Sequence, residues 1–201
     1  MPKENRTKFA ILGMLDCAPM SGYDIRKMSA ISIAHFWKED YGHIYPTLKL
    51  LQDEGLATKE EQASVEGRPG KHIYSITAKG REALVAWLAE TPNPPNLRIE
   101  LLLKVFFGAR AKAKNLSGML AAQEEACRAA IDELNATEKH LQEEVEGEGR
   151  QSRTARFQLM TLRYGKRYYE SLGTWCRESL DELGAAERSG RPNIAGTRAR
   201  A

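Results

Sequence analysis

Four side chains that donate hydrogen bonds stand close together in the sequence: His43, Tyr45, Thr47 and Lys49. The apolar residues around them recur every three or four positions, which is typical of a helix with one buried face. Tyr45 and Lys49 lie four positions apart, so they share one side of such a helix. That side faces away from the apolar stripe and is therefore exposed. The helix therefore has a polar, partly aromatic and basic outer face, and the rest of the chain must indicate what that face contacts.

The ends of this helix can be predicted from Pro46 and Gly55. A proline in the middle of a helix costs about 3 kcal/mol, whereas in the first turn its missing N–H group is not needed. We therefore expect the helix to begin near position 43 or 44 and to end at Gly55, because a left-handed glycine stops helices. Ser21 and Thr77 are the expected N-caps of two neighbouring helices.

The sequence shows no motif that is typical of a catalytic site. The four histidines and the three cysteines, Cys17, Cys127 and Cys176, show no metal-ligand spacing. The sequence also lacks a G-x-S-x-G nucleophile motif and a glycine-rich phosphate loop. We expect reduced thiols within apolar faces, and we expect no enzymatic activity, no metal and no cofactor.

Charge and hydropathy limit the partners and the location of the protein. The net charge is +3, from 30 Lys and Arg against 27 Asp and Glu. Residues 1–90 contain 12 basic residues and 12 acidic residues, so this part has no net charge. DNA binding therefore cannot rest on bulk charge and needs basic residues concentrated on one face. No apolar run approaches the roughly 20 residues of a membrane span, and the charged start does not resemble a signal peptide. We expect a cytoplasmic protein.

The predicted elements of residues 1–91 follow the order helix, helix, helix, hairpin, helix. Helical patterns cover residues 8–18 and 21–37 before the helix described above. Two short alternating runs, 56–62 and 71–77, flank a tip rich in glycine and proline and predict a hairpin. Three helices followed by a two-stranded hairpin indicate a winged helix-turn-helix, in which the third helix enters the DNA major groove and the hairpin is the wing.

PNPPN at residues 92–96 is the expected boundary between two domains, because repeated prolines make a stiff, extended segment. Beyond it, residues 97–185 are helical in pattern. A seven-residue repeat along a long helix predicts coiled-coil-like packing at Leu120, Cys127, Leu134 and Leu141. Residues 186–201 have no periodicity and are expected to form a disordered basic tail. The predicted fold class is mainly α, a winged helix-turn-helix followed by a helical dimerisation domain.

The last predicted helix has apolar bands on two sides. One band includes Phe157 and Tyr164, and the other includes Leu159 and Leu162. A single neighbouring helix covers only one band, so we expect the second band to face another subunit. We therefore predict a homodimer. The side chains expected at its interface are Leu116, Leu120, Leu134, Leu141, Tyr164, Tyr168, Leu172 and Trp175.

Four motifs together resemble the PadR family of bacterial transcriptional regulators. They are SGYDI at 21–25, IYPTLKLLQDEGL at 44–56, GRPGKHIYSITAKGREAL at 67–84 and LRIELLLKVFFG at 97–108. The long helices that end in GTWCRESLDEL are similar to the AphA-like subfamily with the larger C-terminal domain. The resemblance implies a homodimer that binds double-stranded operator DNA through winged helices, commonly as a repressor.

Contact with DNA is expected from three places in the winged helix. The candidates are Ser21, Tyr23, His43, Tyr45, Thr47, Lys49, Arg68 and Lys71. In the third helix the resemblance favours Tyr45, with the alternatives that its ring packs on the second helix, that Lys49 is only solvated and that His43 stabilises a turn. The second helix begins where a helix-turn-helix crosses the DNA backbone. The alternatives to phosphate contact are that Ser21 only caps this helix and that Tyr23 packs in the core. Arg68 and Lys71 flank the wing tip, where we expect them to reach the minor groove or its bordering phosphates, with the alternative that they only keep the tip soluble.

Two alternatives stay open at the level of function. A winged helix can bind proteins instead of DNA, and only a DNA reader would bind a duplex with strong salt dependence and sequence preference. Aromatic side chains of the second domain either form plain core or line a cavity for a small aromatic effector, as the resemblance allows. These side chains are Phe106, Phe107, Tyr164, Tyr168, Tyr169 and Trp175.

Overall fold

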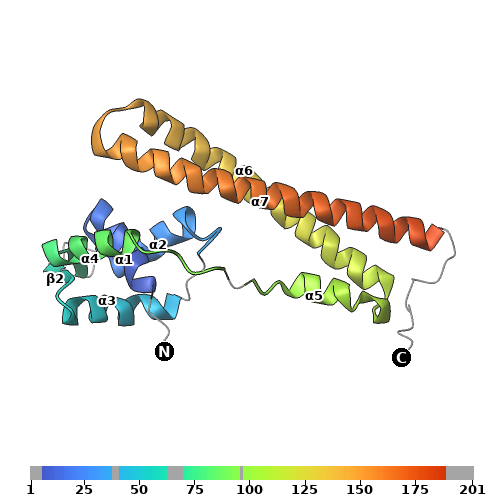
Figure 1. Ribbon diagram of the computed structural model, residues 1–201, viewed down its shortest axis with the longest axis horizontal. Coiled ribbons are helices and arrows are strands. Elements are labelled where there is room, and N and C mark those ends of the chain that lie inside the picture. Colours follow the sequence, from blue (N-terminus) through green and yellow to red (C-terminus); the bar gives the residue numbers. More distant parts are fainter. Residues whose placement is uncertain (1–5, 38–40, 63–69, 96, 189–201) are drawn as a thin grey trace. The chain divides into compact units, whose positions relative to one another are not determined.

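A computed structural model describes residues 6–37, 41–62, 70–95 and 97–188. The chain divides into two compact units, Met1–Pro94 and Pro95–Ala201, and each is described here by itself. The predicted fold class is confirmed, since the described residues are mainly helical with one small antiparallel sheet (Figure 1). Among them, no helix is long and apolar enough to cross a membrane. The tail expected to be disordered lies mostly outside the described residues, although the last helix continues to Arg188.

The first unit contains the predicted order of helices and strands. Its helices are α1 (Thr7–Cys17), α2 (Gly22–Ser32), the short 3₁₀ turn η1 (Tyr41–His43), α3 (Ile44–Asp53) and α4 (Ala78–Leu88). Leucines from α1 and α3 form the centre of its core, and Leu12, Leu48 and Leu51 are completely buried. The rings of Phe9 and Trp87 stack at a centroid distance of 4.7 Å, which joins α1 to α4. This packing holds α3 with one face inward.

The helix ends follow local chemistry. Ser21 is the N-cap of α2 and Thr77 is the N-cap of α4, where its hydroxyl accepts a hydrogen bond from the N–H of Gly80 at 3.0 Å. Pro46 stands in the first turn of α3, where its missing N–H group is not needed. Gly55 has a φ of 71°, the left-handed conformation that ends α3. The predicted caps and the predicted position of the proline are confirmed.

The sheet has three strands in the order β1–β3–β2, so the predicted two-stranded hairpin gains a third member. The hairpin strands are β2 (Ala57–Gln62) and β3 (Lys71–Ile76), paired antiparallel. The extra strand is β1 (Met20–Ser21), which pairs with β3 so that Ser21 lies opposite Ile73. The wing is thereby hydrogen-bonded to the strand that ends at Ser21, the N-cap of α2.

The second unit is a pair of long helices with a short helical segment before them (Figure 1). The segment contains α5 (Glu100–Phe106) and the 3₁₀ turn η2 (Gly108–Arg110). The long helices α6 (Ala113–Glu146) and α7 (Gly149–Arg188) run antiparallel, joined by a turn at positions 147 and 148. An apolar cluster between them includes Leu134, Leu159 and Leu162.

The leucines expected at a subunit interface are buried within this chain. Leu116, Leu120, Leu134 and Leu141 have between 1% and 9% of their surface exposed. Leu134 and Leu141 belong to the cluster with α7, and Leu116 lies against Gly108 of η2. The expectation that these four side chains face a second subunit is therefore corrected: their own chain covers them.

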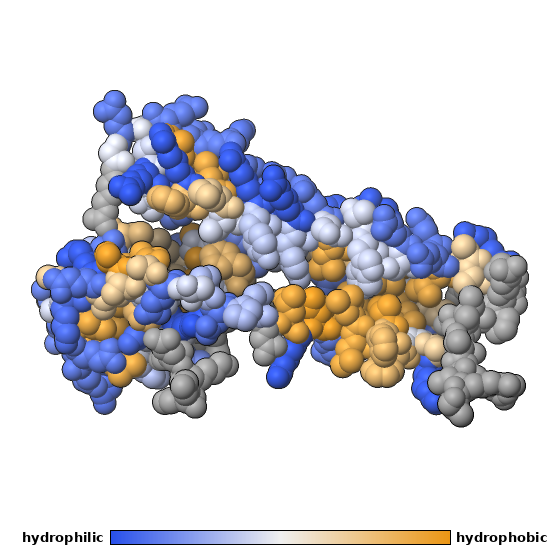
Figure 2. All heavy atoms as spheres, viewed as in Figure 1, coloured by the Kyte–Doolittle hydropathy of each residue, from blue (hydrophilic) through white to orange (hydrophobic). Residues whose placement is uncertain are grey.

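The other band of α7 is exposed at its first residues and half-buried at Leu172 and Trp175. Phe157 and Tyr164 are 58% and 62% exposed, and Tyr168 is 39% exposed. In α5 and the residue after it, Leu103, Phe106 and Phe107 are also exposed, and hydrophobic surface gathers over this segment in Figure 2. Single exposed apolar residues are ordinary, but several large ones along one side of a helix, or gathered on one short segment, indicate an interaction surface.

Candidate nucleic-acid interface

The candidate interface lies where the start of α2, the start of α3 and the base of the wing come together. Ser21 is both the last residue of β1 and the N-cap of α2, so strand pairing with β3 fixes where α2 begins. Tyr45 of α3 lies against Gly22, the first residue of α2. A strand, a cap and one aromatic contact thus position the three elements relative to one another.

Tyr45 is exposed and at the same time packed. The residue is 61% exposed, yet a Cβ atom on Gly22 would lie only 2.6 Å from the Cε1 atom of Tyr45. The two readings of Tyr45 from the sequence, exposed donor and ring packed on the second helix, therefore both hold. Burial first, and the neighbouring Tyr45 second, raise the pKa of Tyr74 in β3.

Lys49 and His43 are exposed, whereas Thr47 is not. Lys49 lies on the outer face of α3 together with Tyr45, and His43 precedes the first residue of the helix without capping it through its side chain. Thr47 is 2% exposed because it stands three positions after the buried Ile44 and shares its face. Thr47 was expected beside the start of the helix as a hydrogen-bond donor to DNA, and this expectation is corrected because its side chain belongs to the core.

The start of α2 is closed by a capping box. The Ser21 hydroxyl donates to Oδ2 of Asp24 at 2.6 Å, and the N–H of Asp24 donates to Oγ of Ser21 at 3.2 Å. Ser21 is 7% exposed, so its hydroxyl is committed to the cap and is not displayed as a free donor. Tyr23 is 67% exposed, which corrects the alternative that it belongs to the core.

The base of the wing carries one described cation beside α2. Lys71 begins β3, and its ammonium nitrogen lies 4.0 Å from Oδ2 of Asp24. Hydrogen bonds from Ser21 are the main reason that the pKa of Asp24 is lowered, and Lys71 contributes further. Arg68, the other cation expected at the tip, lies outside the described residues.

Asp24 and Gly22 were not among the residues predicted for this site. Ser21 followed three positions later by an acid is the signature of a capping box, so the sequence SGYD does contain a signal for Asp24. The role of Gly22 has no such local signal, because it depends on a tyrosine more than twenty positions later in the chain.

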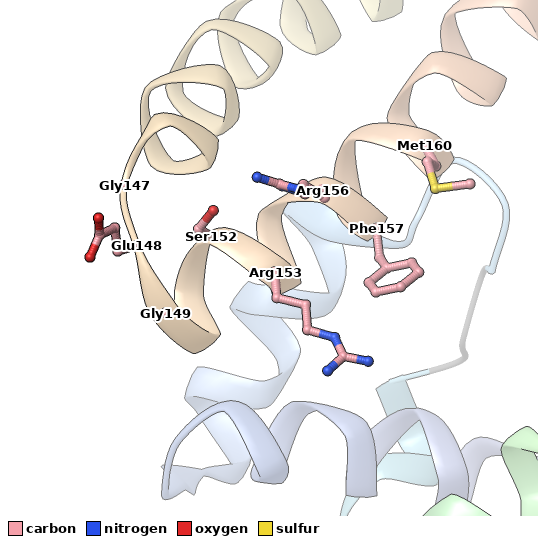
Figure 3. A pocket seen from close by; sticks show the side chains of 8 residues that line it. All are labelled: Gly147, Glu148, Gly149, Ser152, Arg153, Arg156, Phe157 and Met160. Atoms are coloured by element: carbon pink, nitrogen blue, oxygen red, sulfur yellow. The ribbon is translucent and has the colours of Figure 1, made fainter.

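Two hollows of the second unit were considered as ligand sites. The larger, of about 820 Å³, lies at the turn between α6 and α7, where Arg153 and Phe157 extend from one side of α7 and Ser152 points to another (Figure 3). The smaller, of about 190 Å³, lies between the two helices and includes Tyr169 among its lining residues. Of the six aromatic residues considered for an effector cavity, Tyr169 alone lines either hollow. In the described ranges no group of three or more histidine, cysteine or acidic side chains is arranged to hold a metal ion.

This geometry defines a winged-helix protein with a helical second unit, and comparison with known proteins gives its family. Residues 11–86 match the transcriptional regulator PadR-like family, and residues 97–184 match the C-terminal family of the virulence activator alpha. Over 141 residues the chain is 30% identical to the negative transcriptional regulator PadR of Bacillus subtilis (strain 168). The aligned region covers 69% of this chain and 76% of that protein. The chain belongs to the PadR family of transcriptional regulators.

Solved structures are similar over nearly the whole chain. Bacillus subtilis PadR in complex with operator DNA is 25% identical, with a TM-score of 0.76 over 90% of this chain and 99% of that chain. The Vibrio cholerae virulence activator AphA is 28% identical, with a TM-score of 0.67 over 89% and 98% of the two chains. The Bacillus subtilis protein has also been solved with p-coumaric acid, at 25% identity and a TM-score of 0.68 over 92% and 99% of the chains. The resemblance noted in the sequence motifs is thus confirmed, including its AphA-like C-terminal part.

Proposed function

We propose that this PadR-family regulator binds operator DNA sequence-specifically as a homodimer and represses transcription. The observation that carries the proposal is the division of α3 into two faces: Ile44, Leu48 and Leu51 are buried, while Tyr45 and Lys49 are exposed. An exposed phenol and an exposed ammonium group on the third helix of a winged helix are suited to donate hydrogen bonds to base edges and phosphates.

Tyr23 and Lys71 extend this surface. Tyr23 is exposed at the start of α2, where a helix-turn-helix crosses the sugar-phosphate backbone. Lys71 stands at the base of the wing, from which a cation can reach phosphates that border the minor groove. Because residues 1–90 carry no net charge, the cations on this surface, such as Lys49 and Lys71, must supply most of the electrostatic attraction to DNA.

The homodimer is supported by the exposed part of this band of α7. Exposed Phe157 and Tyr164 would leave a large apolar surface in water in a lone chain, and a second copy of the chain would cover it. A dimer would also present two winged helices, which matches the two half-sites that dimeric helix-turn-helix proteins read. We assign residues 1–91 to DNA binding and 97–185 to association.

The test is footprinting on the DNA around the protein's own gene, followed by titration of the protected duplex over a salt series. Sequence-specific binding should show a protected site and a strong decrease in affinity as salt rises. If the full chain gives no protection and binds no duplex with salt dependence, the winged helix serves another purpose, such as contact with a protein.

A small aromatic effector is a second part of the proposal. It is supported by Bacillus subtilis PadR, which has been solved with p-coumaric acid. Titration with p-coumaric acid while operator binding is followed by anisotropy tests it directly. An effector should change the affinity of the chain for operator, and no change over the accessible concentrations would remove this compound as a candidate.

A further inference from the structure

At the start of α2, one carboxylate oxygen of Asp24 contacts three groups that donate hydrogen bonds or carry positive charge. Oδ2 of Asp24 accepts from the backbone N–H of Ser21 at 3.1 Å and from the Ser21 hydroxyl at 2.6 Å. The same oxygen lies 4.0 Å from the ammonium nitrogen of Lys71. This convergence joins the cap of α2 to the base of the wing.

The place of this carboxylate matters because helix N-termini bind anions. In a helix-turn-helix the second helix begins beside the DNA backbone, where its free N–H groups and nearby cations are suited to hold a phosphate. Here the Ser21 N–H, the Ser21 hydroxyl and the Lys71 ammonium group already have an anion, and that anion belongs to the protein itself.

We propose that Asp24 is an affinity-limiting residue, an internal anion that competes with a DNA phosphate for Lys71. This inference rests on the proposed function, since it concerns the same DNA-binding surface. The side chains of Lys71 and Asp24 are 56% and 45% exposed, so their pair is open to exchange with an anion from solvent. In the unmodified chain bound to DNA, Lys71 is shared between Asp24 and a phosphate, so that phosphate is only partly neutralised and the carboxylate repels the backbone.

Asp24→Asn separates this role from capping. The asparagine side chain keeps an oxygen that accepts from the N–H of Ser21, whereas the negative charge opposite Lys71 is removed. Exposed ion pairs are weak, so the expected gain in affinity is about twofold to fivefold, on operator and on a duplex of unrelated sequence alike. The released Lys71 should also steepen the dependence of log affinity on log salt, by up to about 0.9 for each winged helix.

The experiment measures both duplexes over a salt series with the full chain, Asp24→Asn, Lys71→Ala and the double variant. Glu82→Gln is the matched control, because Glu82 is an exposed acid of α4 in the same unit and loses the same charge. Circular dichroism at the working temperature establishes that each variant is folded. The steeper slope should appear in Asp24→Asn, should be absent from the control, and should disappear when Lys71 is also replaced.

The outcomes distinguish this inference from the proposed function. Weaker binding by folded Asp24→Asn would mean that Asp24 positions Lys71 for DNA, and an unchanged slope with a lower melting temperature would mean that it only caps α2. Either result overturns the inference while the proposed function stands. If the unmodified chain itself binds neither duplex, the proposed function fails and takes this inference with it.

Discussion

The ring of Tyr45 lies against the backbone of Gly22, with no room for a side chain between them. A Cβ atom at position 22 would come within 2.6 Å of Cε1 and 2.9 Å of Cζ of the tyrosine. The residue type at the start of α2 therefore determines where an exposed aromatic side chain of α3 can lie. Two elements of the candidate interface are coupled through this one contact.

Gly22→Ala should weaken operator binding with little effect on the fold. The added methyl group displaces the ring of Tyr45, which is free to move because it is mostly exposed. We expect a loss of roughly 1 to 3 kcal/mol in operator binding, the range of one base contact, measured by anisotropy. Gly13→Ala is the control, because a Cβ atom there meets nothing within 4 Å. Equal affinity for both variants would show that the position of Tyr45 is irrelevant.

Tyr45→Ala and Lys49→Ala should each weaken operator binding and leave the protein folded, because both side chains are exposed. A contact with a base edge should relax preference at one position, whereas a phosphate contact should weaken binding to all sequences alike. Titration against operator and single-base variants makes the distinction. Lys139→Ala, an exposed lysine on α6, controls for the loss of charge. Unchanged affinity in both α3 variants would exclude this face as the DNA reader.

Gly80→Ala should destabilise the winged-helix unit. A Cβ atom at position 80 would lie 2.2 Å from the carbonyl oxygen of Leu56 and 2.8 Å from Cγ1 of Ile76, so backbone has to move. Overpacking of this kind typically costs about 1 to 3 kcal/mol, measured by chemical denaturation. Gly118→Ala is the matched change in open space and should stabilise its helix by about 0.5 to 1 kcal/mol. Equal stability of the two variants would contradict the close approach of α4 to Leu56.

Local signals in the sequence predicted the ends of the helices, whereas the covering of their faces depended on distant residues. The caps at Ser21 and Thr77 and the stop at Gly55 could be predicted because each is formed by hydrogen bonds or backbone angles within a few positions. The strand β1 could not, since two residues have no periodicity and pair only because β3 lies beside them.

The same limit explains the errors in the candidate site and in the interface. Periodicity placed Leu120 and Leu134 on one apolar face of a helix, but it does not specify whether the same chain or a second chain covers that face. Thr47 was chosen as a candidate because its side chain donates hydrogen bonds, although its spacing from Ile44 puts it in the core. Tyr45 and Lys49 were placed correctly on an exposed face because both polarity and spacing agreed.

Glu138 should make the stability of the helical unit depend on acid pH. Its carboxylate lies 2.6 Å from Nζ of Lys166 and 3.6 Å from Nε of Arg163, and the hydrogen bond from Lys166 is the main reason that its pKa is lowered from 4.5. Because the folded pKa is depressed, this stabilisation is present above pH 4.5 and is lost as the pH falls through the lowered value. Glu138→Gln should therefore be less stable than the unmodified chain at neutral pH.

Thermal unfolding from pH 7 to pH 2 measures this effect. The difference between Glu138→Gln and the unmodified chain should shrink as the pH falls below the ordinary value of 4.5. Glu143→Gln is the control, because Glu143 is an exposed acid of the same helix, and it should show a much smaller difference at every pH. A constant difference for Glu138→Gln would mean that its carboxylate does not stabilise the fold through Lys166.

Phe157→Ser combined with Tyr164→Ser should convert a dimer into a folded monomer. Both side chains are more than half exposed within one chain, so their removal takes little from its own core. Sedimentation at micromolar concentration measures the association, and circular dichroism measures the helix content. Leu162→Ala is the opposite case, because Leu162 is 3% exposed between α6 and α7, and it should cost about 2 to 5 kcal/mol of stability. A monomeric unmodified chain, or a double variant that associates as tightly as the unmodified chain, would contradict the assignment of this band of α7 to a second subunit.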